Sequence, residues 1–363
     1  MNRYVVNKTS NFFHMNGRIL GYDEEVILGY TNSFIEFELR GCEISFNFRT
    51  GMNEEVNEPG VRVYVDGEAA GEIVLKKQSE RILVYKNDSK AKEEQPEDSS
   101  VSESHRIRLV KITEAAMSFV GISAAEVDGE LQDISKEIDD RPKIEFIGDS
   151  ITCGYGVLGE PYSEYTVREE DGEKSYANVL AQNYNLNARW VSVSGYGMFV
   201  EYTGDPENIV PKVYPYVNWF YDKETREDYS EFEPDIIIVN LGTNDSGHLK
   251  DENILNGFKS KYENFLYTLR TAHKNAAIVC VLGTLAPGVF KYVEEVINKV
   301  KSQGFQKLYG LELPEIDKEN DGLASEHPTY KTHIKDANFI GAFLETEGLV
   351  DAGRRNKGES GNG

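Results

Sequence analysis

Apolar and polar side chains alternate along the first third of the chain, with the period of two that is typical of half-buried β-strands. Two such stretches, residues 35–39 (IEFEL) and 44–48 (ISFNF), are separated by Gly41 and Cys42. Residues 61–65 (VRVYV) continue the pattern and end at Asp66-Gly67, a dipeptide that favours a hairpin turn. Several short alternating strands joined by turns predict an antiparallel β-sandwich.

The pattern changes after the charged connector that ends at Pro142. Short apolar runs now alternate with longer stretches of helical period, which predicts a doubly wound, mostly parallel sheet. We therefore expect a β-sandwich domain over residues 1–135, an α/β domain over 143–350 and a flexible tail over 351–363. Residues 87–105 are polar and without apolar period, so they predict a mobile loop on the sandwich. The expected strands are 143–147, 189–193, 236–241, 277–282 and 307–311, and the expected helices are 175–184, 253–272, 289–301 and 330–345.

Three loops that follow predicted strands carry residues suited to catalysis: Gly148-Asp149-Ser150, residues 194–197 (SGYG) and residues 242–245 (GTND). Parallel strands end at the same edge of a sheet, so these loops are expected to meet over one cleft. A serine there can act as a nucleophile, while a glycine N–H and an asparagine amide can stabilise an oxyanion. For Gly-Asp-Ser alone, a helix N-cap would be the simpler interpretation.

A serine nucleophile also needs a base, and the chain contains six histidines. His327 lies on a predicted loop just before the last helix and is followed by Pro328, which makes it the candidate base. His248 follows the third loop and is a candidate substrate contact. The other four are expected in the β-sandwich or in packing and helix-end positions: His14, His105, His273 and His333.

The chain carries Ser150, Gly195, Asn244 and His327 in this order, and in this it resembles the SGNH or GDSL-type hydrolases. The resemblance covers roughly residues 143–346. This resemblance implies a flavodoxin-like catalytic domain in which Ser150 is the nucleophile and His327 the general base. It also implies an oxyanion hole made by Ser150, Gly195 and Asn244. A preceding sandwich, together with the sequences SGYG and NLGTND, looks like carbohydrate esterase family 2, in which a jelly roll precedes the hydrolase domain. That family removes acetyl groups from xylan, glucomannan and related sugars.

One position departs from the wider SGNH pattern, which has an aspartate three residues before the histidine. This chain has Ala324 there, whereas Asp321 and Glu326 lie at other offsets. Both acids are candidates for orienting His327, but Glu326 adjoins the histidine and is badly placed on an extended loop. Carbohydrate esterase family 2 includes members with a Ser–His dyad in which a backbone carbonyl orients the imidazole, and we predict a dyad here.

The resemblance implies a serine esterase that deacetylates sugars or xylo- and manno-oligosaccharides through an acetyl-enzyme, with an acetylated oligosaccharide as its partner. Tyr155, Tyr196 and Trp219 are candidates for stacking on sugar faces, although ordinary core packing explains such aromatic residues equally well. Two alternatives remain open. One is a lipid-type or thioester hydrolase on the same scaffold, and the other is a carbohydrate-binding protein with a vestigial site.

Composition narrows the partners further. A net charge of −23 argues against nucleic acid and anionic membrane surfaces, which are polyanions. Three scattered cysteines fit neither a disulfide framework nor a zinc site and favour a reducing compartment. No stretch resembles a signal peptide or a membrane span, so we expect a cytoplasmic protein. Neither a metal nor an organic cofactor is implied, and a homo-oligomer remains open.

Overall fold

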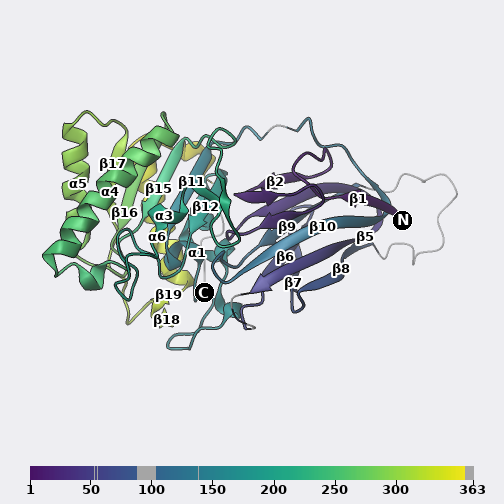
Figure 1. Cartoon of the computed structure of the whole chain (residues 1–363), viewed down its shortest axis with the longest axis horizontal. Helices are drawn as coiled ribbons and strands as arrows, with labels where there is room; N and C mark the ends of the chain where they lie inside the picture. The colour runs from purple at the N-terminus through teal and green to yellow at the C-terminus, as the bar shows by residue number, and fades with distance from the viewer. Residues whose placement is uncertain (53, 55, 88–103, 138, 356–363) are drawn as a thin grey trace. The chain divides into compact units, whose positions relative to one another are not determined.

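The computed structural model describes residues 1–52, 54, 56–87, 104–137 and 139–355 (Figure 1). The chain divides into two compact units, Met1–Ile138 and Asp139–Gly363, which are described in turn. Most of the predicted loop at 87–105, and residues 356–363 of the predicted tail, lie outside the described residues. No helix among the described residues combines the length and apolarity that crossing a bilayer requires.

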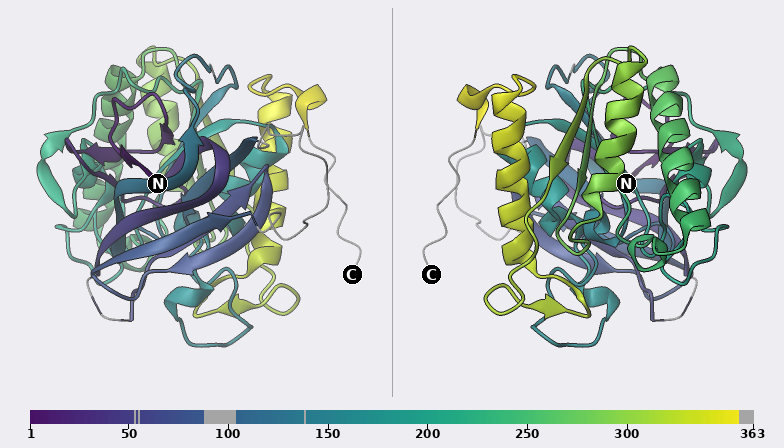
Figure 2. Two further views of the ribbon diagram at one scale, coloured as in Figure 1. Left: turned by 90° about the vertical axis from the view of Figure 1, so that its right-hand side faces the viewer. Right: turned by 90° about the vertical axis from the view of Figure 1, so that its left-hand side faces the viewer.

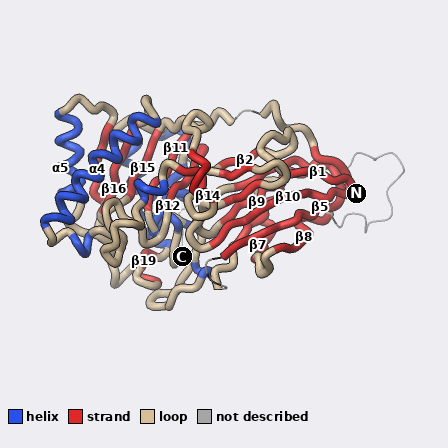
Figure 3. The backbone as a smooth tube through the Cα atoms, viewed as in Figure 1, coloured by secondary structure: helices blue, strands red, loops and turns tan. Residues whose placement is uncertain are grey.

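The first unit is built from antiparallel β-strands, as its alternating pattern predicts (Figure 3). One path through its sheet runs β3-β4-β10-β5-β9-β6-β7, while β1 pairs with β10, and β2 and β8 pair with β5. The inward side chains form a core of aliphatic residues and phenylalanines that includes Phe37, Phe46 and Phe48. The strands are β1 (Asn2–Val5), β2 (His14–Asn16), β3 (Ile19–Gly21), β4 (Val26–Leu28), β5 (Phe34–Met52), β6 (Gly60–Val65), β7 (Glu68–Val74), β8 (Ser79–Lys86), β9 (Ser104–Lys111) and β10 (Ser118–Leu131).

The two stretches expected as separate strands are one continuous strand, β5. Its first part, Phe34–Arg40, pairs with β9, and a later part, Glu43–Arg49, pairs with β8. Gly41 lies between them, opposite Gly129 at a register shift in the partner strand β10. A Cβ atom on Gly41 would lie 2.3 Å from the Asp128 carbonyl oxygen. The glycine therefore permits a close backbone approach where β5 changes partner, and it does not end a strand.

The second unit contains a five-stranded sheet whose pairings are all parallel, in the order β12-β11-β15-β16-β17. Numbered along the chain this order is 2-1-3-4-5, which is the flavodoxin-like arrangement, so the predicted fold class is confirmed. The strands are β11 (Lys143–Gly148), β12 (Asn187–Ser192), β15 (Ile236–Asn240), β16 (Ala277–Leu282) and β17 (Leu308–Glu312).

Helices cover both faces of this sheet, with α4 and α5 on one side and α6 on the other (Figure 2). The α2 and α6 side packs on a core that includes Phe146, Trp190 and Ile238. Two small hairpins, β13–β14 and β18–β19, were not predicted from the sequence pattern. The bounds are α1 (Ser150–Cys153), α2 (Tyr176–Asn183), α3 (Val210–Val213), α4 (Glu252–Ala272), α5 (Phe290–Ser302), α6 (Tyr330–Thr346), β13 (Tyr216–Asn218), β14 (Asp222–Arg226), β18 (Leu323–Ala324) and β19 (His327–Pro328).

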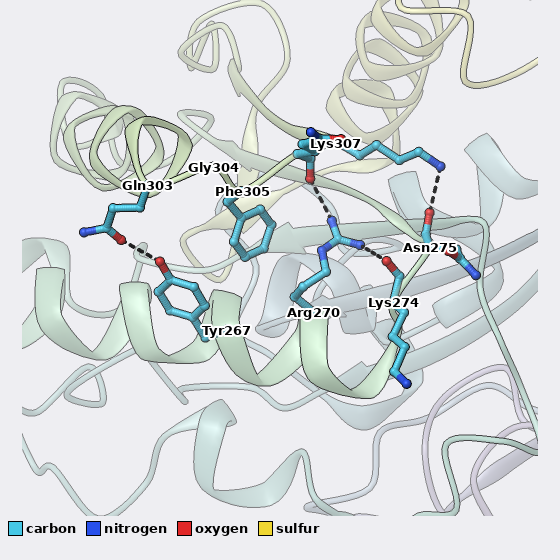
Figure 4. A pocket seen from close by; sticks show the side chains of 9 residues that line it. Tyr267, Arg270, Lys274, Asn275, Gln303, Gly304, Phe305 and Lys307 are labelled. Carbon is cyan, nitrogen blue, oxygen red and sulfur yellow. Dashed lines mark hydrogen bonds between the residues drawn. The ribbon is translucent and has the colours of Figure 1, made fainter.

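Arg270, near the end of α4, ties together the segments that lead into β16 and β17. Its guanidinium donates hydrogen bonds to four backbone carbonyls, those of His273, Lys274, Ala276 and Gln306. Figure 4 shows Arg270 among the residues that surround it. The surrounding residues line a hollow of about 430 Å³. This hollow lies at the amino ends of the strands, whereas α/β sheets bind their ligands at the carboxyl ends. We therefore infer that Arg270 stabilises the fold and does not bind a ligand.

The close approach at Gly41 gives a test of the β5 assignment. Gly41→Ala should lower the free energy of unfolding by ~1–3 kcal/mol, because the new methyl group overlaps backbone atoms of β10. Gly71→Ala in β7 is the matched control, since a Cβ atom there meets nothing within 4 Å. Guanidinium unfolding of both variants, followed by circular dichroism, measures the difference. Equal stability of the two variants would contradict the bulge geometry.

Candidate active site

Ser150 lies where the central strand β11 turns into a short helix. Gly148 ends the strand, and a Cβ atom there would lie 2.0 Å from Thr152 Oγ1, so the tight turn requires glycine. Asp149 caps α1 by accepting a hydrogen bond from the Ile151 N–H at 3.1 Å. Ser150 is the first residue of that helix and is 6% exposed. Because the first N–H groups of a helix have no intrahelical acceptor, the Ser150 N–H is available to a substrate oxygen.

His327 is in contact with this serine through a hydrogen bond of 2.8 Å between its Nε2 and Ser150 Oγ. The other ring nitrogen, Nδ1, lies 2.8 Å from the Ser325 carbonyl oxygen. A carbonyl can only accept, so Nδ1 carries the proton and Nε2 is free to receive one from the serine. The two residues that were predicted to react are therefore together, in the tautomer that a general base needs.

The carbonyl that orients His327 comes from the turn of the β18–β19 hairpin. Ser325 and Glu326 form this turn with φ angles of 47° and 62°. Two successive positive φ angles are the signature of a type I′ turn, which usually contains Asn or Gly. Ser325 is held by Ser163, whose carbonyl oxygen accepts its N–H at 3.1 Å and its hydroxyl at 3.0 Å. These bonds support a backbone conformation that is unfavourable for non-glycine residues.

The structure does not use either acid that was a candidate for orienting His327. The Asp321 carboxylate is bound by Lys335 at 2.6 and 2.7 Å and lies 3.3 Å from Lys331. Glu326 occupies the turn, and the imidazole N–H is directed to the Ser325 oxygen instead. Asp321 and Glu326 were therefore wrong as orienting residues, and the dyad geometry is the one present.

The oxyanion-hole candidates lie on the loops that follow the two strands flanking β11. Gly195 follows β12 with a φ of 78°, and among the described residues no atom accepts a hydrogen bond from its N–H. The Asn244 side-chain amide, after β15, donates to the Tyr196 carbonyl at 3.0 Å and has a long contact of 3.5 Å with Asp149 Oδ2. One strong bond thus fixes the amide plane, and its second N–H is available to an oxyanion.

Asp245 links these two loops, a role that the sequence analysis did not find. Its buried carboxylate accepts hydrogen bonds from the backbone N–H groups of Met198, Phe199 and Val200 at 2.8–2.9 Å. The residue next to the oxyanion donor Asn244 therefore holds the loop that carries Gly195. Its position in the sequence GTND was the only signal, because the backbone groups that it binds cannot be identified from residue types.

Burial sets the charge state of the ionisable groups around the dyad. It raises the pKa of Asp149 to about 7, with a further contribution from the neighbouring Asp245. Burial likewise raises the pKa of Asp245. In both cases the cause is the cost of placing a charged carboxylate in a buried site. Burial also lowers the pKa of His327, although the Ser325 carbonyl and the Glu326 charge oppose this shift.

The four candidate substrate contacts occupy different surroundings. The Tyr155 ring packs against His327 with centroids 4.5 Å apart, and the Tyr196 carbonyl accepts the Asn244 amide. Trp219 lies in the turn of the β13–β14 hairpin and packs against Tyr216. His248 Nε2 lies 3.0 Å from the carbonyl oxygen of Tyr202, so this histidine braces the loop after Gly195. Substrate contact by any of these four residues stays a prediction.

Comparison with known proteins agrees with this geometry. Residues 146–308 match the GDSL-like Lipase/Acylhydrolase family. The matched segment carries Ser150, Gly195 and Asn244 and ends before His327, so this part of the second unit is similar to a GDSL-like acylhydrolase domain.

The more specific similarity is to carbohydrate esterases. The chain is 33% identical to the cellulase/esterase CelE of Acetivibrio thermocellus over 253 residues, which are 67% of this chain and 30% of that protein. It is 22% identical to an acetylxylan esterase / glucomannan deacetylase of Cellvibrio japonicus over 235 residues, 61% of this chain and 64% of that protein. The matched regions thus span less than two thirds of these curated relatives.

Solved structures extend the similarity over both units. A family two carbohydrate esterase from Clostridium thermocellum, in complex with cellohexaose, has a TM-score of 0.80 at 27% identity, covering 93% of this chain and 100% of that one. The acetyl xylan esterase Est2A from Butyrivibrio proteoclasticus shares the fold with a TM-score of 0.82 at 23% identity, covering 96% and 99%. The predicted resemblance to carbohydrate esterase family 2 is confirmed.

The dyad can be tested by neutralising the two acids. Neither Asp321→Asn nor Glu326→Gln should lower kcat by more than about tenfold, because a backbone oxygen holds the imidazole. Neutralising a true triad carboxylate costs ~10⁴-fold. Steady-state kinetics with a short acetyl ester measures the effect, and thermal unfolding controls for loss of the Asp321–lysine contacts. A thousandfold loss in either folded variant would replace the dyad with a triad.

The lowered pKa of His327 determines the acid limit of activity. A general base works in its neutral form, and a lowered pKa keeps the imidazole neutral to lower pH. The acid limb of kcat/KM should therefore have its midpoint below pH 6.5, the ordinary value for histidine. Initial rates with a short acetyl ester between pH 4 and 8 give this midpoint. A midpoint above 6.5 would show that the imidazolium is stabilised in the free enzyme.

Proposed function

We propose that this protein is a serine esterase that removes O-acetyl groups from acetylated sugars or oligosaccharides. The observation that carries the proposal is the hydrogen-bonded pair of Ser150 Oγ and His327 Nε2, which lie 2.8 Å apart. The similarity to carbohydrate esterases supports the sugar as the alcohol part of the ester. The names of acetylxylan esterase and glucomannan deacetylase among the relatives support acetate as the acyl part.

In the first half of the reaction, Ser150 Oγ attacks the acetyl carbonyl carbon while its proton moves to His327 Nε2. The carbonyl oxygen becomes an oxyanion, which the N–H groups of Ser150 and Gly195 and the Asn244 amide stabilise. The tetrahedral intermediate then collapses. The bond to the sugar oxygen breaks, that oxygen takes the proton from His327, and the acetyl group remains on the serine.

The second half repeats the same steps with water. His327 Nε2 removes a proton from a water molecule, and the resulting hydroxide attacks the acetyl-enzyme carbonyl. The same donors stabilise the second oxyanion. When the intermediate collapses, the proton on His327 returns to Ser150 Oγ and acetate is released. The Ser325 carbonyl keeps the ring in the required tautomer through both halves, although it stabilises imidazolium less than a carboxylate would.

Removing the nucleophile is the direct test. Ser150→Ala should lower kcat for p-nitrophenyl acetate on the order of 10⁶-fold, since the proposed nucleophile is lost. The fold should be retained because the hydroxyl contributes little packing. Ser302→Ala, on the exposed end of α5, is the matched control and should leave the rate unchanged. Near-native turnover by the Ser150 variant would end the serine-esterase proposal.

The same assay design identifies the substrate class. Acetylated xylo-, manno- and gluco-oligosaccharides should be hydrolysed with release of acetate, and p-nitrophenyl esters should lose activity as the acyl chain lengthens. A preference for long acyl chains would indicate the lipid-type alternative. Binding of the oligosaccharides without acetate release would indicate a carbohydrate-binding protein.

A further inference from the structure

The orientation of the His327 ring is not fully explained by its two hydrogen bonds. Hydrogen bonds at the two ring nitrogens do not prevent the ring from tilting about the line that joins these nitrogens, and the outer torsion of a histidine side chain has a broad energy profile. Bonds to Ser325 O and Ser150 Oγ therefore leave the plane of the ring loosely defined. A triad carboxylate would narrow this range, but the structure has a carbonyl in its place. Contacts on the face of the ring must supply the missing restraint.

Tyr155 makes such a contact. Its ring centroid lies 4.5 Å from that of His327, with an angle of 44° between the ring planes. It also stacks on Tyr165, with centroids 3.7 Å apart and planes within 7°. Parallel rings at 3.7 Å leave no room between them, so His327 packs on a part of Tyr155 that Tyr165 does not cover. The packing role that the sequence left open for Tyr155 is thus present, and a sugar contact by this tyrosine stays a prediction.

The outer member of the stack is itself held in place. The Tyr165 hydroxyl donates a hydrogen bond to Glu170 Oε2 at 3.1 Å, and Glu170 is only 1% exposed. The pair of tyrosine rings therefore cannot slide away without breaking a bond to a buried carboxylate. The stack is a rigid support between Glu170 and His327.

The backbone of Tyr155 is tied to the nucleophile. Its N–H donates to the Ser150 carbonyl oxygen at 3.1 Å, which fixes the backbone of Tyr155 relative to that of Ser150. The next residue, Gly156, has a φ of 67°, and a Cβ atom there would lie 3.1 Å from the Ala324 carbonyl oxygen. The chain thus passes closely against the β18–β19 hairpin directly after Tyr155. The backbone at Tyr155 and Gly156 is therefore held against Ser150 on one side and against the β18–β19 hairpin on the other.

We propose that Tyr155, supported by Tyr165, is the positioning residue of His327, and that its ring, not its hydroxyl, sets the plane of the imidazole. The proposal rests on the Ser150–His327 chemistry proposed above but not on a sugar substrate. A misplacement of a reacting group by about 1 Å can cost 10²-fold in rate. Loss of the ring should therefore reduce turnover of every ester by a similar factor, whatever its alcohol.

The experiment compares Tyr155→Leu and Tyr155→Phe with p-nitrophenyl acetate and with an acetylated xylo-oligosaccharide. Tyr155→Leu should lower kcat roughly 10–100-fold for both esters with little change in KM. Tyr155→Phe keeps the ring and should stay within about threefold of the parent. Tyr165→Leu, which removes only the support, should fall between them. Thermal unfolding of each variant separates a loss of positioning from a loss of fold.

Tyr162→Leu is the matched control, because this tyrosine belongs to the same loop and is 86% exposed. Its kcat for p-nitrophenyl acetate should match the parent. A rise in KM confined to the oligosaccharide in Tyr155→Leu would make Tyr155 a sugar contact and overturn the proposal. A large loss in Tyr155→Phe would give the role to the hydroxyl, which also overturns it. If the parent hydrolyses p-nitrophenyl acetate but no acetylated sugar, only the proposed substrate fails.

Discussion

The hydrogen bond from His327 Nδ1 to the Ser325 carbonyl is the interaction on which the site depends. It selects the tautomer that leaves Nε2 free to act on Ser150, and it does so without a buried negative charge. The ionisable groups around the dyad are in a similar situation, because burial disfavours their charged forms. The pKa of His327 is lowered and the pKa values of Asp149 and Asp245 are raised for the same reason. The site therefore stabilises charge mainly where the reaction creates it, at the oxyanion.

The parallel sheet brings the reacting groups together because β12 and β15 flank β11. Each of these strands ends at the same edge, so three loops that are far apart in sequence become neighbours. Asp245 then joins two of them through three backbone hydrogen bonds. The nucleophile and the oxyanion donors are thus fixed by the core, while the base is supplied by a small hairpin that needs its own supports.

Much of this could be predicted from the sequence, because β11, β15 and β16 are almost entirely buried and appear in the sequence as short, mostly apolar runs. Their order, and the pairing of Ser150 with His327, followed from recognisable motifs. Gly41 was misread, since a glycine at a close approach looks the same in a sequence as a glycine at a turn. The turn at Ser325 was missed because it lacks the usual Asn or Gly. The stack on Tyr155 could not be seen because it depends on ring orientation across a loop.

The main-chain origin of the orienting group has a consequence for how this active site tolerates change. A side-chain acid can be deleted by a single substitution, whereas a carbonyl is present in every amino acid. Replacing Ser325 by most residues would keep the carbonyl and alter only the ease with which the turn forms. The vulnerable property is the length and path of the hairpin, so that an insertion, a deletion or a proline there would misdirect the oxygen. Orientation of the catalytic histidine thus depends on the backbone path of the hairpin more than on the identity of the residue at position 325.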